Sequence, residues 1–377
     1  MRGNIRSRGK GTWEVRIDIG RDPLTGKRRQ VSRTVRGRKR DAEGLAASLI
    51  SQHEVGIDAP RGRQSVGNFL QHWLRDYAKP NTAPKTFRRY EEIVRLHLIP
   101  VIGNVSLSKL RPSHIQGVHR KVTEKRLSAR TALHCHRVLK EALQHAVRWQ
   151  LLSRNPADAV DAPRPQRYEI AAQGPDDLKR LLDSADQTRY GPLVSVALLT
   201  GLRMGELFGL RWLDVDLDNG VLRVQQTCQW LSGEGFIFRQ PKSHRSTRPV
   251  ALSPDTVEIL RGRRVSYLEE RLAAGTAYED NGLVFADALG RPLHPHTVWD
   301  GWRRIVKATG LPRLRFHDLR HAHASLLMAQ GVHPKIVSER LGHSSVSITL
   351  DIYSHVAPNL QADAAAGLDT LLKRGNA

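Results

Sequence analysis

The positive charge of this chain is concentrated in its N-terminal residues, and this asymmetry limits how the chain can fold. Residues 1–160 carry +20 of the formal net charge of +23, whereas residues 161–377 are nearly balanced. An excess of this kind repels itself in a compact state unless a counter-charged partner is bound. We therefore expect the first 160 residues to present surfaces to a polyanion, most simply nucleic acid.

The composition is that of a multidomain globular protein. The 377 residues suggest two or three domains, and 40% hydrophobic residues are enough for packed cores. The only cysteines, Cys135 and Cys228, exclude a disulfide-built secreted fold and fit a reducing cytoplasm. No apolar run approaches the roughly 18 residues that span a bilayer, and the N-terminal charges are not followed by the apolar core of a signal peptide. We expect a cytoplasmic, nucleoid-associated protein without a membrane partner.

Residues 1–58 have the pattern of a small β-sheet with one helix. Hydrophobic residues alternate over 12–19, a turn cluster follows at 22–26, and a second strand is predicted over 30–35. Asp41 is predicted to cap a helix that runs to about Val55. A basic sheet of two or three strands can enter a DNA groove. The cations expected to line one face of this sheet are Arg16, Arg28, Arg29, Arg33 and Arg36.

Residues 57–64 have the composition of a linker, and residues 65–160 have the spacing of amphipathic helices. We predict a bundle of four or five helices there, followed by a second linker at 161–166. The residues with helical apolar spacing are Val66, Phe69, Leu70, Trp73, Leu74, Leu139, Leu143, Ala146 and Val147. The cations expected to face outward are Arg88, Arg89, Arg120, Lys121 and Arg130.

Residues 167–377 are predicted to alternate helices with one short group of strands, at 221–226, 236–240 and 248–252. Three glycines, Gly201, Gly331 and Gly342, are expected at helix ends or tight turns. The predicted fold class is therefore mainly α with small β elements. Its three predicted domains are an N-terminal β-sheet-plus-helix domain (1–58), a helical bundle (65–160) and a mixed α+β domain (167–377).

Four stretches of the third segment contain the residue types that phosphodiester chemistry requires. They are TGLRMGEL over 200–207, Pro-Lys at 241–242, HDLRH over 317–321, and LGH over 341–343 with a tyrosine ten residues later. Breaking a phosphodiester without a metal needs cations on the non-bridging oxygens, a nucleophile, an acid for the leaving oxygen, and groups that move protons.

Each stretch supplies one of these requirements. Arg203 and Arg320 are candidates for the phosphate clamp, because the guanidinium fork matches phosphate in a bidentate way. Lys242 is a candidate for the acid, and His317 and His343 for the base and for hydrogen bonding. The candidate nucleophile is Tyr353.

In these motifs the sequence resembles the tyrosine recombinase (phage integrase) family, over residues 174–358. TGLRMGEL matches the first arginine box of the family, with Glu206 as its acidic supporting residue. PKSHRSTRPVAL matches the hairpin-lysine segment, HDLRH the His-x-x-Arg box, LGH the His/Trp position, and LDIYSH the tyrosine segment. The six core positions hold the expected residue types: Arg203, Lys242, His317, Arg320, His343 and Tyr353.

The resemblance implies a function and a set of partners. The tyrosine of the family attacks a DNA phosphate, forms a 3′-phosphotyrosyl bond and releases a 5′-hydroxyl, and a 5′-hydroxyl from the partner duplex reverses the step. We expect integration and excision of a phage or mobile element at double-stranded DNA attachment sites, by a homotetramer on two duplexes, with an excision factor and a DNA-bending host protein as possible partners. In this resemblance 1–58 is the arm-type DNA-binding domain, 65–160 the core-binding (SAM-like) domain and 167–377 the catalytic domain.

No cofactor or metal is expected. The chain has no G-x-x-x-x-G-K-[ST] phosphate loop, and His134, Cys135 and His136 are consecutive in a helical pattern, where neighbouring side chains diverge. The alternatives are a cellular recombinase that resolves chromosome or plasmid dimers, a type IB topoisomerase, and a non-catalytic DNA-binding protein. The extra basic segment 1–58 argues against the first, and the six filled positions argue against the last.

Overall fold

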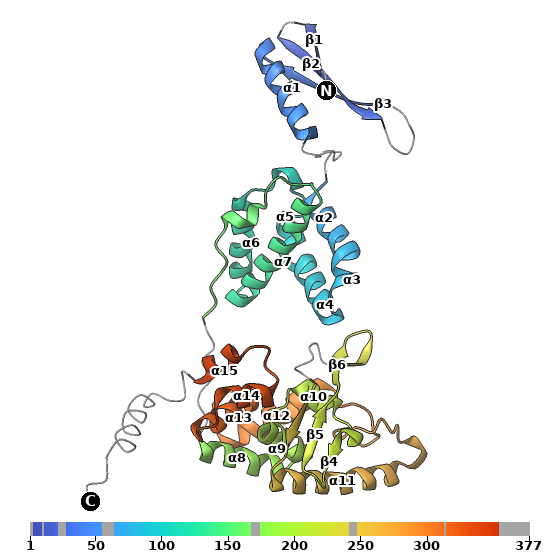
Figure 1. Ribbon diagram of the computed structural model, residues 1–377, viewed down its shortest axis with the longest axis vertical. Coiled ribbons are helices and arrows are strands. Elements are labelled where there is room, and N and C mark those ends of the chain that lie inside the picture. The colour runs from blue at the N-terminus through green and yellow to red at the C-terminus, as the bar shows by residue number, and fades with distance from the viewer. Residues whose placement is uncertain are drawn as a thin grey trace, which may run out of the picture. The chain divides into compact units, whose positions relative to one another are not determined.

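The computed structural model describes residues 3–9, 11–21, 28–54, 64–166, 174–240, 247–312 and 314–353. The chain divides into two compact units, residues 1–168 and 169–377. Helices predominate and the sheets are small, which confirms the predicted fold class (Figure 1). The first predicted linker lies outside the described residues except for Gln64, whereas residues 161–166 are described and contain no helix or strand.

The N-terminal residues form a three-stranded antiparallel sheet covered on one face by a helix. The strands are β1 (Gly3–Gly9), β2 (Thr12–Arg21) and β3 (Arg28–Arg36), in the order β1-β2-β3, and the helix is α1 (Lys39–Glu54). Val15 and Ile17 of β2 are buried with Ala42 and Ala46 of α1. The alternation of β2 therefore places its apolar side under the helix, as the sequence pattern predicts.

Two details of this sheet differ from the prediction. Arg16 pairs with Ser32, and Arg33 pairs with Val15, so Arg16 and Arg33 lie on opposite faces of the sheet. Asp41 is not the helix cap. It lies in the first turn of α1, where its carboxylate accepts a hydrogen bond from the backbone N–H of Arg38 at 2.7 Å.

Residues 64–166 form four continuous helical rods around a core of their own. The three longest α-helices of this part are α4 (Pro84–Ile93), α6 (Pro112–Glu124) and α7 (Ala129–Arg148). The first rod has a π-helical turn at Leu74–Ala78, and the second has one at Val94–Leu98. The remaining elements are α2 (Val66–Trp73), η1 (Leu74–Ala78), α3 (Lys79–Asn81), η2 (Val94–Leu98), α5 (Ile99–Ile102), η3 (Leu107–Lys109) and η4 (Pro156–Ala159).

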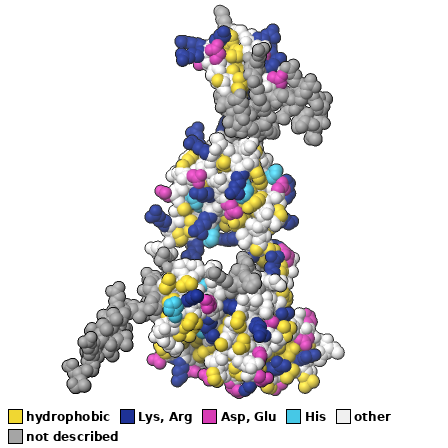
Figure 2. Space-filling view, viewed as in Figure 1, with side chains coloured by type: hydrophobic (Ala, Val, Ile, Leu, Met, Phe, Trp, Pro, Cys, Tyr) yellow, Lys and Arg dark blue, Asp and Glu magenta, His cyan; other side chains and the backbone are white. Residues whose placement is uncertain are grey.

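Capping and core burial explain this bundle. The Ser65 hydroxyl accepts the N–H of Asn68 at the start of α2, and the Ser128 hydroxyl accepts the N–H of Thr131 at the start of α7. The predicted stripe is buried except for Val147, which is half-buried. The predicted outward cations are exposed except for Arg88, which is also half-buried. Basic side chains are spread over these helices in Figure 2.

The described part of the second unit has two apolar cores, the largest of the protein and a smaller one of Ala324, Met328, Val337 and Leu341. Its helices are α8 (Pro175–Asp186), α9 (Gly191–Thr200), α10 (Met204–Gly209), η5 (Trp212–Asp214), α11 (Pro254–Ala274), η7 (Gly275–Ala277), α12 (Pro295–Thr309), α13 (Asp318–Ala329), α14 (Pro334–Leu341) and α15 (Val346–Tyr353). Helix α9 is apolar almost all round and nearly fully buried, so its end provides a rigid base for the residues that follow.

The strands of this unit form two small sheets instead of one group. One contains β4 (Val215–Asp216), β5 (Val221–Val224) and β8 (Arg248–Ala251), in the order β4-β5-β8. The other is the hairpin of β6 (Thr227–Leu231) and β7 (Gly235–Arg239). The sequence prediction placed β5, β7 and β8 to within two residues and missed β4 and β6. Among the described residues, no helix combines the length and apolarity needed to cross a membrane.

Candidate active site

Arg203 lies at the turn between two helices. Helix α9 ends at Thr200, Gly201 follows with φ of +67°, and Arg203 is the N-cap residue of α10. This left-handed backbone conformation favours glycine at 201. A side chain there would also be too close to its neighbours, because a Cβ would lie 2.8 Å from Cδ2 of His323. The buried helix and the tight turn together fix the direction in which Arg203 leaves the core.

The carboxylate of Glu206 is almost completely buried and holds Arg203 in place. It accepts Nη1 of Arg203 at 2.7 Å and the backbone N–H of Arg203 at 3.0 Å. The Glu206 side chain is 2% exposed, whereas that of Arg203 is 37% exposed. Burial by itself would raise the pKa of Glu206, but the hydrogen bonds and charges of Arg248 and Arg203 lower it overall. The carboxylate is therefore ionised and holds the partly exposed guanidinium in place.

Arg248 is a third arginine of this cluster, and our sequence reasoning did not identify it. It is the first residue of β8, and its Nη1 and Nη2 donate to the two carboxylate oxygens of Glu206 at 3.3 and 3.0 Å. Its Nε donates to the carbonyl of Arg340 at 2.6 Å. The signal available in the sequence was an arginine that begins an apolar strand, where a cation is buried only if it is paired.

Arg320 is buried on α13 and is held by two backbone carbonyls. Its Nη1 donates to Gly201 at 2.7 Å and its Nη2 to Leu341 at 2.6 Å. Arg203 in turn donates from Nη2 to the carbonyl of Gly342 at 2.8 Å. The carbonyls of Leu341 and Gly342 are adjacent in the chain, so Arg320 and Arg203 converge on the same turn of backbone. Desolvation, followed by the charge of Arg203, lowers the pKa of Arg320 to about 9. The predicted pair of arginines is thus brought together.

The two histidines of HDLRH lie beside this cluster. His317 precedes the first turn of α13, and its ring meets that of His321 edge to face with centroids 5.2 Å apart. The side chain of His317 is open to solvent, yet partial desolvation, His321 and Arg320 together lower its pKa. Asp318 between them is buried and accepts a bidentate pair from Arg315. His317 is therefore neutral near pH 7 and exposed toward solvent.

His343 follows the C-cap glycine of α14 and is oriented by α15. Its Nδ1 shares a hydrogen bond of 2.8 Å with the hydroxyl of Thr349, which is fully buried. Burial, Arg320 and Arg203 lower the pKa of His343 to about 3, so the ring is neutral at physiological pH. Thr349 is four residues before Tyr353 on the same helix, so the two positions are about one helical turn apart along α15.

Of Lys242 and Tyr353, the structure describes only the backbone of Tyr353. Lys242 lies outside the described residues, in the stretch 241–246 between β7 and β8. Tyr353 is the last residue of α15, and only its helical backbone is described.

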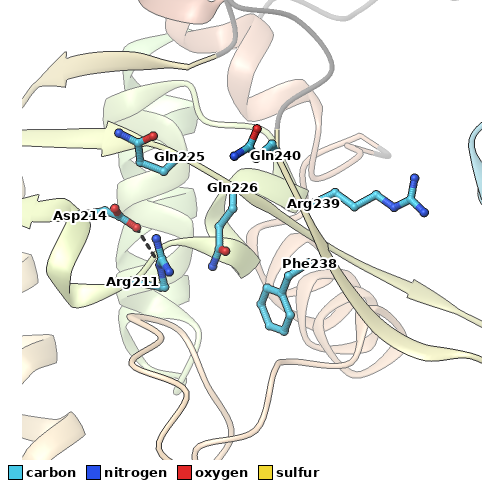
Figure 3. Close-up of a pocket in the computed structure, with 7 residues that line it drawn as sticks. All are labelled: Arg211, Asp214, Gln225, Gln226, Phe238, Arg239 and Gln240. Carbon is cyan, nitrogen blue, oxygen red and sulfur yellow. Dashed lines mark hydrogen bonds and ion pairs between the residues drawn. The ribbon is translucent and has the colours of Figure 1, made fainter.

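A polar cavity of about 450 Å³ lies next to the β6–β7 hairpin and is separate from the arginine cluster (Figure 3). Arg211 and Asp214 form an ion pair of 3.0 Å along it, and Gln240, which directly precedes Pro241, lies at its edge. The described lining of this cavity includes none of Arg203, His317, Arg320 and His343. Among the described residues, no group of three or more potential metal-ligating side chains is arranged to bind a metal ion.

Comparison with known proteins identifies the family. A model described as "Phage integrase family" matches residues 174–359, and "Phage integrase, N-terminal SAM-like domain" matches residues 65–122. An integrase of Streptomyces ambofaciens is 30% identical over 99% of both chains. The chain belongs to the tyrosine recombinase (phage integrase) family. A XerC-like tyrosine recombinase of Caldanaerobacter subterraneus is 28% identical over 98% of both chains.

Solved structures show that the fold is that of tyrosine recombinases. The integrase of transposon Tn1549, in complex with a circular intermediate DNA, has a TM-score of 0.70 at 20% identity and covers 81% of this chain and 99% of that one. A lambda integrase tetramer bound to a Holliday junction has a TM-score of 0.57 at 20% identity and covers 91% and 96%. The protein is a site-specific integrase and a tyrosine-type recombinase.

Proposed function

We propose that this recombinase cuts and rejoins DNA with Tyr353 as the nucleophile and with Arg203 and Arg320 as the phosphate clamp. The observation that carries the proposal is the arrangement of these arginines. Arg203, the N-cap residue of α10, and Arg320 of α13 donate to the adjacent backbone carbonyls of Gly342 and Leu341, which brings the two cations together. Placing two cations together costs free energy, which a bound phosphate would recover.

The other roles follow from chemistry and position. A neutral His343, with Nδ1 engaged by Thr349, has Nε2 as the nitrogen for a phosphate oxygen or for a proton in transit. His317 is neutral and exposed, as a proton-transfer group must be. Lys242 protonates the 5′-oxygen as it leaves, and Glu206 holds Arg203. Attack by a 5′-hydroxyl on the 3′-phosphotyrosyl bond then exchanges one ester for another and needs no cofactor.

The N-terminal residues supply DNA-binding surfaces in this proposal. Residues 1–58 are the arm-binding domain, residues 65–160 the core-binding domain, and residues 167–377 the catalytic domain. In support, residues 5–50 and 66–160 have separate apolar cores. The sheet face away from α1 contains the exposed cations Arg6, Arg16 and Arg36. Basic side chains on an exposed sheet suit the phosphates that flank a DNA groove.

The proposed assembly is a homotetramer on two attachment-site duplexes. The similar lambda integrase structure is a tetramer bound to a Holliday junction, and the similar Tn1549 integrase structure contains a circular intermediate DNA. By analogy, the element served by this recombinase is a phage or an integrative element, and an excision factor and a DNA-bending host protein set the direction of the reaction. Dimer resolution remains the alternative, because one full-length relative is XerC-like.

A strand-exchange assay tests the proposal. The protein is incubated with supercoiled plasmids that contain one attachment site or two matching sites. We expect recombinant products only when two sites are present, because a partner duplex must supply the attacking 5′-hydroxyl. Relaxation of the one-site plasmid without recombinants from the two-site plasmid would indicate a topoisomerase instead.

A further inference from the structure

Arg248 shares the carboxylate of Glu206 with Arg203, but it is not one of the six predicted catalytic residues. Its side chain is 6% exposed, and Glu206, its ionic partner, is 2% exposed. A cation buried to this degree is costly unless its donors are satisfied. Arg248 meets this requirement with a carboxylate and with the Arg340 carbonyl, which come from α10 and α14 respectively.

The contacts of Arg248 connect two parts of the site that are far apart in the sequence. Arg248 binds Glu206, and Glu206 in turn accepts a hydrogen bond from Arg203. Arg248 also donates to the carbonyl of Arg340, two residues before Gly342, whose carbonyl accepts a second hydrogen bond from Arg203. Gly342 itself packs on Arg248, since a Cβ at 342 would lie 2.8 Å from Nη1 of Arg248. Arg203 is therefore held from two sides by groups that Arg248 touches.

The charge of Arg248 also controls the ionisation of Glu206. The charged groups that face this carboxylate are Arg203 at the start of α10, Arg248 on β8 and Arg320 on α13. His343, which follows α14, is neutral and adds no charge. Arg248 makes the largest contribution that lowers the pKa of Glu206, against a burial that raises it.

We propose that Arg248 is a positioning residue for DNA cleavage: it keeps Glu206 ionised and aligned, so that Arg203 is directed at the scissile phosphate. This inference rests on the proposed function and adds a residue to it. Arg248 does not touch the DNA phosphate in this account, and it directs Arg203 through Glu206.

The inference predicts a particular pH dependence. Without Arg248 the buried carboxylate of Glu206 would bind a proton at higher pH, because burial would be opposed only by Arg203 and the more distant Arg320. A protonated Glu206 no longer anchors Arg203 by charge. Cleavage should then decline at a higher pH as the solution is acidified, so the acid limb of the rate profile shifts upward.

Arg263 is a matched control within the same unit. It is also buried, its Nε donates to the Val284 carbonyl at 3.0 Å, and its Nη2 pairs with Glu270 at 2.8 Å. It therefore has the same types of partner as Arg248, but it lies on α11 and contacts none of the predicted site residues among the described residues. Loss of either arginine should lower stability, whereas only loss of Arg248 should change the pH profile of cleavage.

The experiment measures single-turnover formation of the covalent protein–DNA adduct on a nicked core-site substrate from pH 5 to 9, in the full-length protein. DNA affinity and thermal unfolding are measured in parallel. Arg248→Gln should slow the adduct by roughly 10- to 100-fold near pH 7.5, as expected for loss of a charged hydrogen-bonding partner, with little change in affinity. The acid limb of the pH–rate profile of Arg248→Gln should shift to higher pH. Arg248→Lys should return that limb toward its position in the parent protein. Arg263→Gln should leave both the rate and the limb unchanged.

If Arg248→Gln does not fold, a double variant tests whether Arg248 acts through Glu206. Glu206→Gln combined with Arg248→Gln replaces both buried charges by neutral amides, and it should cleave no more slowly than Glu206→Gln alone. Three results would overturn the inference. The double variant could cleave more slowly than Glu206→Gln alone, or Arg248→Gln could keep the acid limb of the parent pH–rate profile. Arg248→Gln and Arg263→Gln could also change cleavage equally. Absence of the adduct from the parent protein would instead overturn the proposed function, and the inference with it.

Discussion

The carbonyl of Gly201 accepts a hydrogen bond from Nη1 of Arg320 at 2.7 Å, although the two residues are 119 positions apart in the chain. Gly201 ends a buried helix and precedes Arg203 by two residues. The same short turn therefore positions one arginine through the chain and the other through space. Backbone carbonyls do not titrate, so this support is the same at every pH at which the protein is folded.

Substitution of Gly201 tests that support. Gly201→Ala places a Cβ in a left-handed conformation and against Leu341 and His323. Gly331→Ala is the matched control, because its φ is +79° but no atom lies within 4 Å of the new Cβ among the described residues. We expect about 1–2 kcal/mol of destabilisation for Gly331→Ala from the backbone alone. Gly201→Ala should lose roughly 1–3 kcal/mol more from overpacking, and it should also cleave more slowly. Equal losses in denaturant titrations would contradict this account.

The buried histidines predict that the protein loses stability in mild acid. His323 accepts Nε of Arg340, and burial together with the charge of Arg340 lowers its pKa to about 4 from an ordinary 6.5. Between these values the unfolded chain binds a proton that the folded chain does not, so stability is complete above pH 6.5 and falls as the pH drops toward 4. The slope is about 1.4 kcal/mol per pH unit for one such group.

Denaturant titrations at pH 7, 6 and 5 measure this slope. His323→Gln keeps an acceptor for Arg340 but cannot titrate, so its slope should be smaller than that of the parent. Identical pH dependence in the two proteins would show that His323 is not the group that responds.

Lys242 is predicted to protonate the leaving 5′-oxygen. Lys242→Ala should slow cleavage of ordinary DNA by roughly 10²–10⁴-fold, because an alkoxide is a poor leaving group. A 5′-bridging phosphorothiolate leaves without that proton, so the variant should regain most of its rate on this substrate. If the variant is equally slow on both substrates, Lys242 serves in binding or in structure instead.

Removal of residues 1–58 should separate cleavage from integration. The truncated protein should still cleave a bare core site, because the six predicted positions all lie beyond residue 200. It should fail to integrate a full attachment site, where one protein must bind arm and core DNA together. Integration at the parent rate would favour a simpler two-domain recombinase.

The faces of the N-terminal sheet allow a sharper version of this test. Arg16 and Arg36 lie on the face away from α1, whereas Arg33 lies on the same face as the buried Val15. In binding to arm DNA, Arg16→Gln and Arg36→Gln should each reduce the salt slope by about 0.9 per lost phosphate contact. Arg33→Gln is the control and should change the slope less. The reverse order would show that the other face binds DNA.

Local spacing made part of the site predictable. Arg203 and Glu206 are three residues apart at the start of a helix, so their ion pair follows from helical geometry. The helix ends at Gly201 and Gly342 were also predictable, because the left-handed conformation there favours glycine.

Long-range partners were not predictable in this way. The pairing of Arg248 with Glu206 spans 42 positions and depends on how β8 packs against α10. The opposite faces of Arg16 and Arg33 depend on the register of a hairpin with an irregular pairing after Asp18. A change of one residue in such a register exchanges the two faces, and the composition of the strands does not determine it.

Formation of the covalent adduct by Tyr353→Phe tests the central claim most directly. The substitution removes one hydroxyl and little volume, so folding and DNA binding should persist. The control is Tyr190→Phe, which removes a hydroxyl that donates to the Thr297 carbonyl in the same unit. On a nicked substrate that traps the intermediate, the parent and Tyr190→Phe should form the protein–DNA adduct and Tyr353→Phe should form none. An adduct with Tyr353→Phe would mean that another residue is the nucleophile and would contradict the account.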